Sequence, residues 1–401
     1  TYFQHSPRGT YCLLPNGKNC AAGVECASGS CAKTCQAEPC DVCANGCPHT
    51  TVQAAIDAAS AGSTIKIDAG IYAEDLKVTN MDLTLTNCNG SAVTLKNVAD
   101  GSRTLMLGDL SDVAPHKMVT IRNLTITGSS TPIASDPEPV VPTVGTGGIE
   151  AYTNLIIEGT TRVTGCNWLD NGGGIYMGPV DEALTLTVRD QAEVSDNYAD
   201  AEGGGIYLDS YIHAKLILED DARIVGNYAT GAGGGFKTKH QVLAEMSGNA
   251  EVSYNRASYG GAGYIYCSTD ALCLKMTGQS RMVFNTAKNY GGGAIWIYDN
   301  TDTYPNTIEM YDDTLIADNQ SLRADTYGAG IYAEDSTTRL LMTGNARITR
   351  NTVVTTTTVT DGGGVYQMTL DIRDQAAIIS NTPGNCQTVT FEPGSKQCGV
   401  A

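Results

Sequence analysis

Short apolar segments recur along most of the chain and alternate with polar or glycine-rich turns. From about residue 63 onward, phrases such as STIKI, LTLTN, MVTIRNLTIT and NLIIEG are rich in Val, Ile, Leu and Thr. This pattern is typical of short β-strands bounded by turns. It predicts an all-β chain.

One segment, TTVQAAIDAASAG, carries apolar residues at helical spacing instead. Its apolar positions share one face of a helix, namely Val52, Ala55, Ile56 and Ala59. Thr50 and Gln53 can form a capping box, and Gly62 can end the helix. We expect this helix, over residues 49–62, to cap a stack of strands whose first member would otherwise expose apolar side chains and unpaired backbone groups.

Three sequence columns repeat in step along the second half of the chain. Glycine-rich blocks such as GGGIYM and GGGIYL begin at residues 172, 203, 233, 260, 291, 328 and 362. A recurring asparagine accompanies the blocks, at Asn197, Asn227, Asn255, Asn285, Asn319, Asn351 and Asn381. Six residues before each asparagine stands a Gln, Asp or Asn, at Gln191, Asp221, Asn249, Gln279, Asp313, Asn345 and Gln375. The constant offset means that the intervening strand never changes length, so insertions collect at another corner of the repeat.

Each repeat of about 30 residues holds three strands, for example GGIYLD, AKLILED and ARIVGN. Stacked at about 4.8 Å, such repeats predict a right-handed, single-stranded parallel β-helix with three strands per coil and a length of roughly 50 to 60 Å. The 401 residues then form one long domain rather than two or three globular ones. The predicted organisation is a disulfide-rich segment (1–48) followed by the β-helix (49–401), which comprises the capping helix, irregular coils (63–165), regular repeats (166–385) and a C-terminal staple (386–401).

The asparagine column predicts a ladder in which amide side chains hydrogen-bond from coil to coil. Because every regular coil carries the residue, we interpret the ladder as structural rather than catalytic. The glycine runs supply positive φ and allow close stacking of turns. They are not phosphate-binding loops, since no helix and lysine follow them.

Cysteines concentrate at the N-terminal end. Eight of the fourteen lie within one polar segment: Cys12, Cys20, Cys26, Cys31, Cys35, Cys40, Cys43 and Cys47. This segment is too polar to bury a core, so disulfides are the expected staple. Zinc binding by Cys40, Cys43 and Cys47 with His49 is the alternative. Elsewhere two pairs can close locally, Cys267 with Cys273 and Cys386 with Cys398, which leaves Cys88 and Cys166 unassigned.

The net charge of −18 argues against nucleic acid as a partner, because binding to phosphates requires clustered Lys and Arg. An acidic surface is compatible with Ca²⁺, a neutral glycan or high solubility, and no cofactor is firmly indicated. No apolar run approaches the roughly 18 residues that span a bilayer. Together with the cysteines, this indicates a secreted, extracellular or cell-surface protein from which a signal peptide has been removed. Sequons at Asn89, Asn123 and Asn319 would permit N-glycosylation.

Candidate catalytic or ligand-binding carboxylates stand in the longer connections, at Asp181, Glu182, Glu334 and Asp335. Glycosidases need two such groups, and acidic clusters can bind Ca²⁺. Other acids lie in the turn column, where Asp is favoured for local hydrogen bonds, namely Asp220, Asp221, Asp312 and Asp313. His213 and His240 have no partner at a set spacing. A Pro-rich insertion over residues 130–145 is expected to be a surface loop long enough to bind a partner.

The stretch TTVQAAIDAASAGSTIKIDAGIYAE resembles the N-terminal cap and first coil of pectin-active β-helix proteins, the pectinesterases and pectate lyases. GIYAE, at residues 70–74, is its most specific part. The resemblance implies the fold and suggests polysaccharide cleavage. The phrases that carry the chemistry in pectinesterases and polygalacturonases are not found in this chain.

The repeats over residues 165–381 resemble those of polymorphic outer-membrane proteins, in which a GGA-type block alternates with an FxxN-type block; residues 284–289 followed by GGGAI match best. That resemblance implies a surface-exposed adhesin or structural passenger. Our first hypothesis is therefore a non-enzymatic structural or adhesive β-helix that binds a glycan or cell-surface partner, or self-associates through its rod ends. The alternative is a polysaccharide lyase or glycoside hydrolase.

Overall fold

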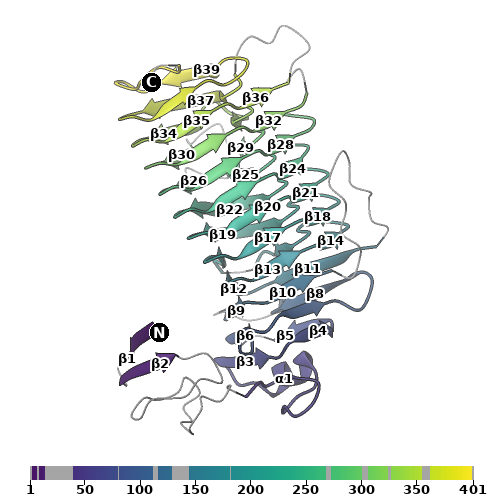
Figure 1. The fold of residues 1–401 in the computed structure, drawn as a ribbon. Coiled ribbons are helices and arrows are strands. Elements are labelled where there is room, and N and C mark those ends of the chain that lie inside the picture. The colour runs from purple at the N-terminus through teal and green to yellow at the C-terminus, as the bar shows by residue number, and fades with distance from the viewer. Residues whose placement is uncertain are drawn as a thin grey trace.

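The computed structural model describes residues 2–6, 9–13, 39–79, 81–111, 116–128, 144–180, 182–267, 272–299, 306–323, 327–354 and 362–399. Parallel strands wind into a long β-solenoid, with one short helix, α1 (Val52–Ala58), at the N-terminal end (Figure 1). Near the N-terminus, β1 (Tyr2–Ser6) and β2 (Gly9–Leu13) pair with each other as an antiparallel hairpin. The predicted all-β parallel architecture is confirmed.

One series of stacked strands forms an 11-stranded parallel sheet. Its members are β4 (Gly70–Ala73), β7 (Val93–Lys96), β10 (Thr125–Thr127), β13 (Arg162–Thr164), β17 (Glu193–Ser195), β20 (Arg223–Val225), β23 (Glu251–Ser253), β27 (Arg281–Val283), β31 (Leu315–Ala317), β35 (Arg347–Thr349) and β38 (Ala377–Ile379). At the usual spacing between strands, eleven strands make a stack about 50 Å long.

A second series begins at the glycine-rich blocks, and we call its outer surface the glycine-block face. It comprises β5 (Leu76–Val78), β8 (Ser102–Leu107), β11 (Thr146–Ala151), β15 (Ile175–Met177), the first halves of β19 (Ile206–Leu218) and β22 (Phe236–Met246), β25 (Gly263–Cys267), β29 (Ile295–Asp299), β33 (Ile331–Ala333) and the first half of β37 (Val365–Ile372).

Two more series complete the coils. The third contains β3 (Ser63–Ile67), β6 (Leu83–Asn87), β9 (Met118–Arg122), β12 (Asn154–Glu158), β16 (Thr185–Val188), the second halves of β19, β22 and β37, β26 (Leu272–Met276), β30 (Thr307–Met310), β34 (Arg339–Met342) and β39 (Cys386–Phe391). The fourth consists of two-residue strands, β14 (Asn167–Trp168), β18 (Tyr198–Ala199), β21 (Tyr228–Ala229), β24 (Arg256–Ala257), β28 (Thr286–Ala287), β32 (Gln320–Ser321) and β36 (Thr352–Val353).

The core is a continuous column of aliphatic side chains inside the coils. In the third series, for example, Leu186 pairs with Leu216, which in turn pairs with Ala244, and all three are buried. Alternation along each strand sends one residue inward and the next outward. Each coil therefore extends the same interior, which explains why the apolar pattern repeats with the coil.

The seven asparagines of the repeating column lie one above another and are at most 7% exposed. The Asn197 amide donates to Oδ1 of Asn227 at 2.9 Å, and the backbone N–H of Asn197 donates to the same oxygen at 3.0 Å. The same pair of bonds links each asparagine to the next, up to Asn381. Cys166, buried and free, stands below the first rung, and its N–H donates to Asn197. The ladder thus satisfies a row of buried amides without water.

The cap differs from the prediction. The helix begins after Thr51, whose hydroxyl accepts the N–H of Ala54 at 3.2 Å, so the expected capping box of Thr50 and Gln53 is wrong. Glu74 takes its place, because its carboxylate accepts the N–H groups of Val52 and Gln53 at 2.8 and 2.9 Å. A carboxylate from the first coil satisfies the free donors of the helix N-terminus. The helix ends at Ala58, before the glycine expected to stop it.

Four disulfides are present among the described residues: Cys40–Cys88, Cys43–Cys47, Cys267–Cys273 and Cys386–Cys398. The two local pairs were predicted and are confirmed. Cys88, left unassigned by the sequence, ties the N-terminal segment to the first coils. The zinc alternative is wrong for Cys40, Cys43 and Cys47, because all three are oxidised. Cys12 lies in β2, and Cys20, Cys26, Cys31 and Cys35 lie outside the described residues.

Candidate functional site

The outward positions of the glycine-block strands carry a column of side chains that are aromatic except for one lysine, and we call it the aromatic column. In consecutive coils its members are Tyr176, Tyr207, Lys237, Tyr264, Trp296, Tyr332 and Tyr366. The phrase GIY explains the placement, because its Ile points into the core and the next residue must point out. The rings stack along the solenoid, with 4.0 Å between the centroids of Trp296 and Tyr332 and 5.0 Å between those of Tyr332 and Tyr366.

A second group of tyrosines stands at the corner just before the glycine runs. Tyr259 and Tyr290 stack at 4.0 Å with nearly parallel planes. The ring of Tyr259 is also perpendicular to that of Trp296, at a centroid distance of 5.0 Å and an angle of 87°. The corner tyrosines therefore form a wall at right angles to the aromatic column.

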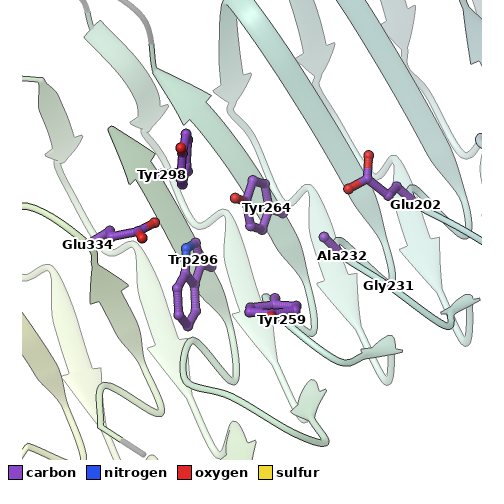
Figure 2. A pocket seen from close by; sticks show the side chains of 8 residues that line it. All are labelled: Glu202, Gly231, Ala232, Tyr259, Tyr264, Trp296, Tyr298 and Glu334. Atoms are coloured by element: carbon purple, nitrogen blue, oxygen red, sulfur yellow. The ribbon is translucent and has the colours of Figure 1, made fainter. Parts of the chain in front are cut away.

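These two walls enclose a pocket of about 250 Å³. Its lining consists of Glu202, Gly231, Ala232, Tyr259, Tyr264, Trp296, Tyr298 and Glu334. Figure 2 shows the two glutamates on opposite sides of the aromatic group. Gly231 and Ala232 present no large side chain, which leaves one side of the pocket open. The site combines aromatic surface with a carboxylate near each side, a composition typical of small-molecule and sugar pockets.

Lys237 occupies the aromatic column next to this pocket and is 6% exposed. Its ammonium pairs with the carboxylate of Glu202 and lies 4.4 Å from the ring centroid of Tyr264. Burial lowers the pKa of Lys237, and Glu202 opposes that change. The lysine is thus held by one carboxylate and one aromatic face, as in a cation–π site.

Glu334 stands on the other side without such a partner. No Lys, Arg or His of the described residues lies within ion-pair distance of its carboxylate. Burial raises its pKa, and the nearby indole of Trp296 opposes the rise. Burial, then the hydrogen bond and charge of Tyr290, and then the charge of Glu334 raise the pKa of Tyr259 to about 12. Glu334 is therefore an exposed carboxylate that pairs with no cationic side chain in the described part of the chain.

The indole of Trp296 belongs to the aromatic column, lies beside Tyr259 and Glu334 (Figure 2) and is 7% exposed. Its Nε1 is buried and makes no hydrogen bond of normal geometry with the residues that the structure describes. A buried donor without an acceptor is costly, so this group is available to a ligand oxygen. The pocket thus holds an indole N–H without a full hydrogen bond next to the Glu334 carboxylate, whose charge that indole stabilises.

The carboxylates predicted from the sequence do not form one site. Glu334 lies in the pocket, but its neighbour Asp335 accepts the N–H of Thr337 at 2.9 Å and stabilises a turn. Glu182 accepts the backbone N–H of His116 at 3.0 Å, five coils away along the glycine-block face, a separation of roughly 24 Å. Glycosidase carboxylates lie no more than about 10 Å apart. Asp181 lies outside the described residues, as does the Pro-rich insertion up to residue 143.

His240 has no partner at a set spacing in the sequence, but the structure gives it one. Its Nδ1 lies 2.6 Å from a carboxylate oxygen of Asp209, and the ring of Tyr211 packs on it at 4.1 Å. The contact joins neighbouring strands β19 and β22, so no spacing in the sequence reveals it. Tyr266 links this pair to the pocket, because it lies beside His240 and also packs on Tyr298 at 4.9 Å.

Sequence reasoning missed the aromatic column, although its signal was present. The blocks GGGIYM, GGGIYL, GGGAIWI, GAGIYA and GGGVYQ place the aromatic residue after an inward aliphatic one, and in GAGYIY Tyr264 follows Gly263. Of the three predicted glycosylation sites, the one at Asn319 is wrong. It is fully buried in the ladder and bonded on both sides, so the folded protein offers no room for a glycan there.

Within the described residues, no three His, Cys, Asp or Glu side chains converge as a metal site. No helix in that part of the chain has the length and hydropathy needed to traverse a bilayer. The resemblances to pectin-active enzymes and to polymorphic outer-membrane proteins thus rest on the short phrases that suggested them. Comparison of the whole chain with protein-family models, curated proteins and solved structures gives no match.

Proposed function

We propose that this protein is an extracellular, non-enzymatic β-solenoid that holds a glycan chain on its glycine-block face. The observation that carries the proposal is the pocket around Trp296, in which perpendicular aromatic walls stand beside an indole N–H without a full hydrogen bond and the carboxylate of Glu334. Sugar rings present apolar C–H faces and hydroxyl groups that both donate and accept hydrogen bonds. Aromatic side chains with a few well-placed polar groups complement both features.

The arrangement of the aromatic column supports a polymer rather than a small metabolite. Tyr264, Trp296, Tyr332 and Tyr366 follow one another along the solenoid in register. A polysaccharide repeats its unit along its own axis in the same way. Successive sugar units can therefore meet successive rings, and several weak contacts add to a useful affinity.

A cell-surface or matrix setting belongs to the same proposal. The disulfides are compatible with an oxidising compartment. We also infer right-handed winding and an adhesive or structural role, since connections between parallel strands are nearly always right-handed. A rigid rod with a ligand-binding face is better suited to an adhesive or structural role than to the role of a diffusible signalling protein.

Polysaccharide cleavage is the second candidate, and the pair of Asp209 and His240 favours it. A carboxylate that orients the Nδ1 proton of an imidazole leaves Nε2 able to accept a proton, which is the arrangement of a general base. We rank this candidate second because the predicted acids lie far apart. Release of reducing ends by the wild type, abolished by His240→Ala, would make cleavage the first candidate.

The experiment that tests the proposal is a glycan array followed by calorimetric titration of the retained glycans. Tyr298→Ala removes a pocket wall, and we expect at least a fivefold loss of affinity, equivalent to about 1 kcal/mol for one aromatic contact. Tyr254→Ala is the matched control. That tyrosine is 59% exposed and stands at the corner between β23 and β24. Failure of every glycan to bind, or equal losses in both variants, would refute the proposal.

A further inference from the structure

We propose that the pocket selects a glycan with free amino groups, whose protonated nitrogen pairs with Glu334 against the aromatic walls. This inference rests on the proposed glycan-binding function and names its ligand class. The ligand is then a polymer containing unacetylated hexosamine units.

Lys237 shows how this surface holds an ammonium group. Its Nζ sits 4.4 Å from the ring centroid of Tyr264 while Glu202 neutralises its charge. An ammonium held between an aromatic face and a carboxylate is stabilised by both, and more strongly when water is excluded. The protein itself thus places a primary amine at one side of the pocket.

The other side also combines a carboxylate with aromatic side chains. Glu334 and the rings of Trp296 and Tyr298 all line the pocket there. No cationic side chain of the described residues reaches Glu334, and Arg323 instead packs over the ring of Tyr290 at 5.6 Å. Aromatic rings and a carboxylate line the pocket there, as an aromatic ring and a carboxylate contact Lys237 at the first position.

Trp296 supplies a second polar group at the site. Its buried Nε1 has no acceptor of normal geometry among the described residues and belongs to the pocket lining. A hexosamine carries a hydroxyl on the carbon next to its amine. That hydroxyl can accept from Nε1 while the ammonium donates to Glu334, so one sugar unit satisfies both groups.

The charge of the pocket favours a cationic glycan over acidic and neutral glycans. An acidic glycan would place more negative charge beside Glu334 on a protein whose net charge is −18. A neutral glycan would cover Glu334 without compensating it, which costs free energy because a buried carboxylate loses its hydration. A cationic glycan neutralises the carboxylate as it covers it.

The test compares three hexamers by calorimetry at about pH 6, above the ordinary carboxylate range and low enough to keep sugar amines protonated. The probes are β-1,4-linked glucosamine, the same hexamer with every amine acetylated, and galacturonate. We expect wild-type protein to bind the glucosamine hexamer at least tenfold more tightly than the acetylated one, with galacturonate weakest. Glu334→Gln should remove most of this preference, because it weakens the glucosamine complex and relieves the acetylated complex of an uncompensated charge.

Glu309→Gln is the matched control, because it removes the same charge from an outward position of β30, outside the pocket. It should keep the preference, and an equal loss in both variants would overturn the inference by showing a long-range charge effect. A second measurement uses wild-type protein alone. Salt at about 0.5 M should weaken the glucosamine complex and spare the acetylated one, because exposed ion pairs are screened.

The outcomes distinguish the two proposals. Equal affinity for the amine and acetylated hexamers overturns the inference and leaves glycan binding standing. An unchanged preference in Glu334→Gln also overturns it. Binding of no hexamer, together with an empty glycan array, refutes the glycan-binding function itself.

Discussion

Replacing Asn285 by alanine removes one rung from the middle of the asparagine ladder. The Oδ1 of Asn285 accepts both the backbone N–H and the amide of Asn255, each at 3.0 Å. Its own amide donates to the carbonyl of Val252 and to Oδ1 of Asn319, each at 2.9 Å. The substitution therefore breaks bonds toward both neighbouring coils, and the backbone of its own coil stays in place.

The loss of stability in Asn285→Ala comes from the hydrogen-bond donors of Asn255 that are left without an acceptor. Asn255 is 0% exposed, so its backbone N–H and one amide proton lose their acceptor where water cannot replace it. Each unsatisfied buried donor costs about 1 to 3 kcal/mol, so the expected loss is about 4 kcal/mol. Asn249→Ala is the control, since that exposed amide donates only to the side chain of Asp221. Its loss should stay below about 1 kcal/mol.

The assay is native-state hydrogen exchange combined with urea unfolding. Stacked repeats can open locally, so a single unfolding midpoint understates a local defect. We expect the amide of Asn255 to lose protection in Asn285→Ala and not in Asn249→Ala. Losses of similar size in the two variants would refute our assignment of the ladder as a major source of stability.

Three further predictions follow from single contacts. Cys88→Ser opens the link to Cys40, which closes a loop of 48 residues, and should cost about 4 kcal/mol in the unfolding of the N-terminal coils, measured by limited proteolysis in urea. Gly205→Ala places a Cβ 2.5 Å from a carbonyl oxygen of the next coil and should cost more than about 2 kcal/mol by thermal unfolding, whereas a neutral effect would contradict the close stacking. The Asp371 carboxylate has a pKa held below its ordinary value, first by hydrogen bonds from Arg373, so its stabilising effect is complete at neutral pH and is lost as the pH falls from about 4 through that lowered pKa. Asp371→Asn should accordingly be less stable than wild type at pH 7 and equal to it in strong acid, and a constant difference at all pH values would exclude this linkage.

The architecture could be predicted because each coil must bury the same positions and stack on its neighbours in the same way. Strand alternation, the glycine blocks and the constant offset before each asparagine all report stacking of equivalent positions. The contact between Asn197 and Asn227 could be predicted from their recurring position in the sequence alone. Contacts that occur once in the fold were not visible, since the sequence carries no repeat that would reveal them.

Two such contacts are the cap on α1 and the N-terminal disulfide. Glu74 takes over the helix N-terminus from 22 residues away, and Cys40 finds Cys88 across a separation of 48 residues. Neither separation is encoded by a local pattern. The pairing of Asp209 with His240 is missed for the same reason, because it depends on the register between neighbouring coils.

The candidate site was predictable only in part. Glu334 stood out as an acid that turn chemistry does not explain, and it lines the pocket. The pocket residues Trp296 and Tyr259 lie in other coils, Trp296 on the glycine-block face and Tyr259 at the corner before it. Reading the glycine blocks as the origin of an outward aromatic row would have found Trp296, whereas the perpendicular wall required the structure.

Hydroxyl-radical footprinting with and without the glucosamine hexamer tests the central claim most directly, because it reports on aromatic side chains one by one. Saturating ligand should reduce oxidation of Tyr264, Trp296 and Tyr298 and leave Tyr254 unchanged. Protection confined to Tyr254, or no protection at any of these rings while the ligand is bound, would show that the glycine-block face is not the binding surface.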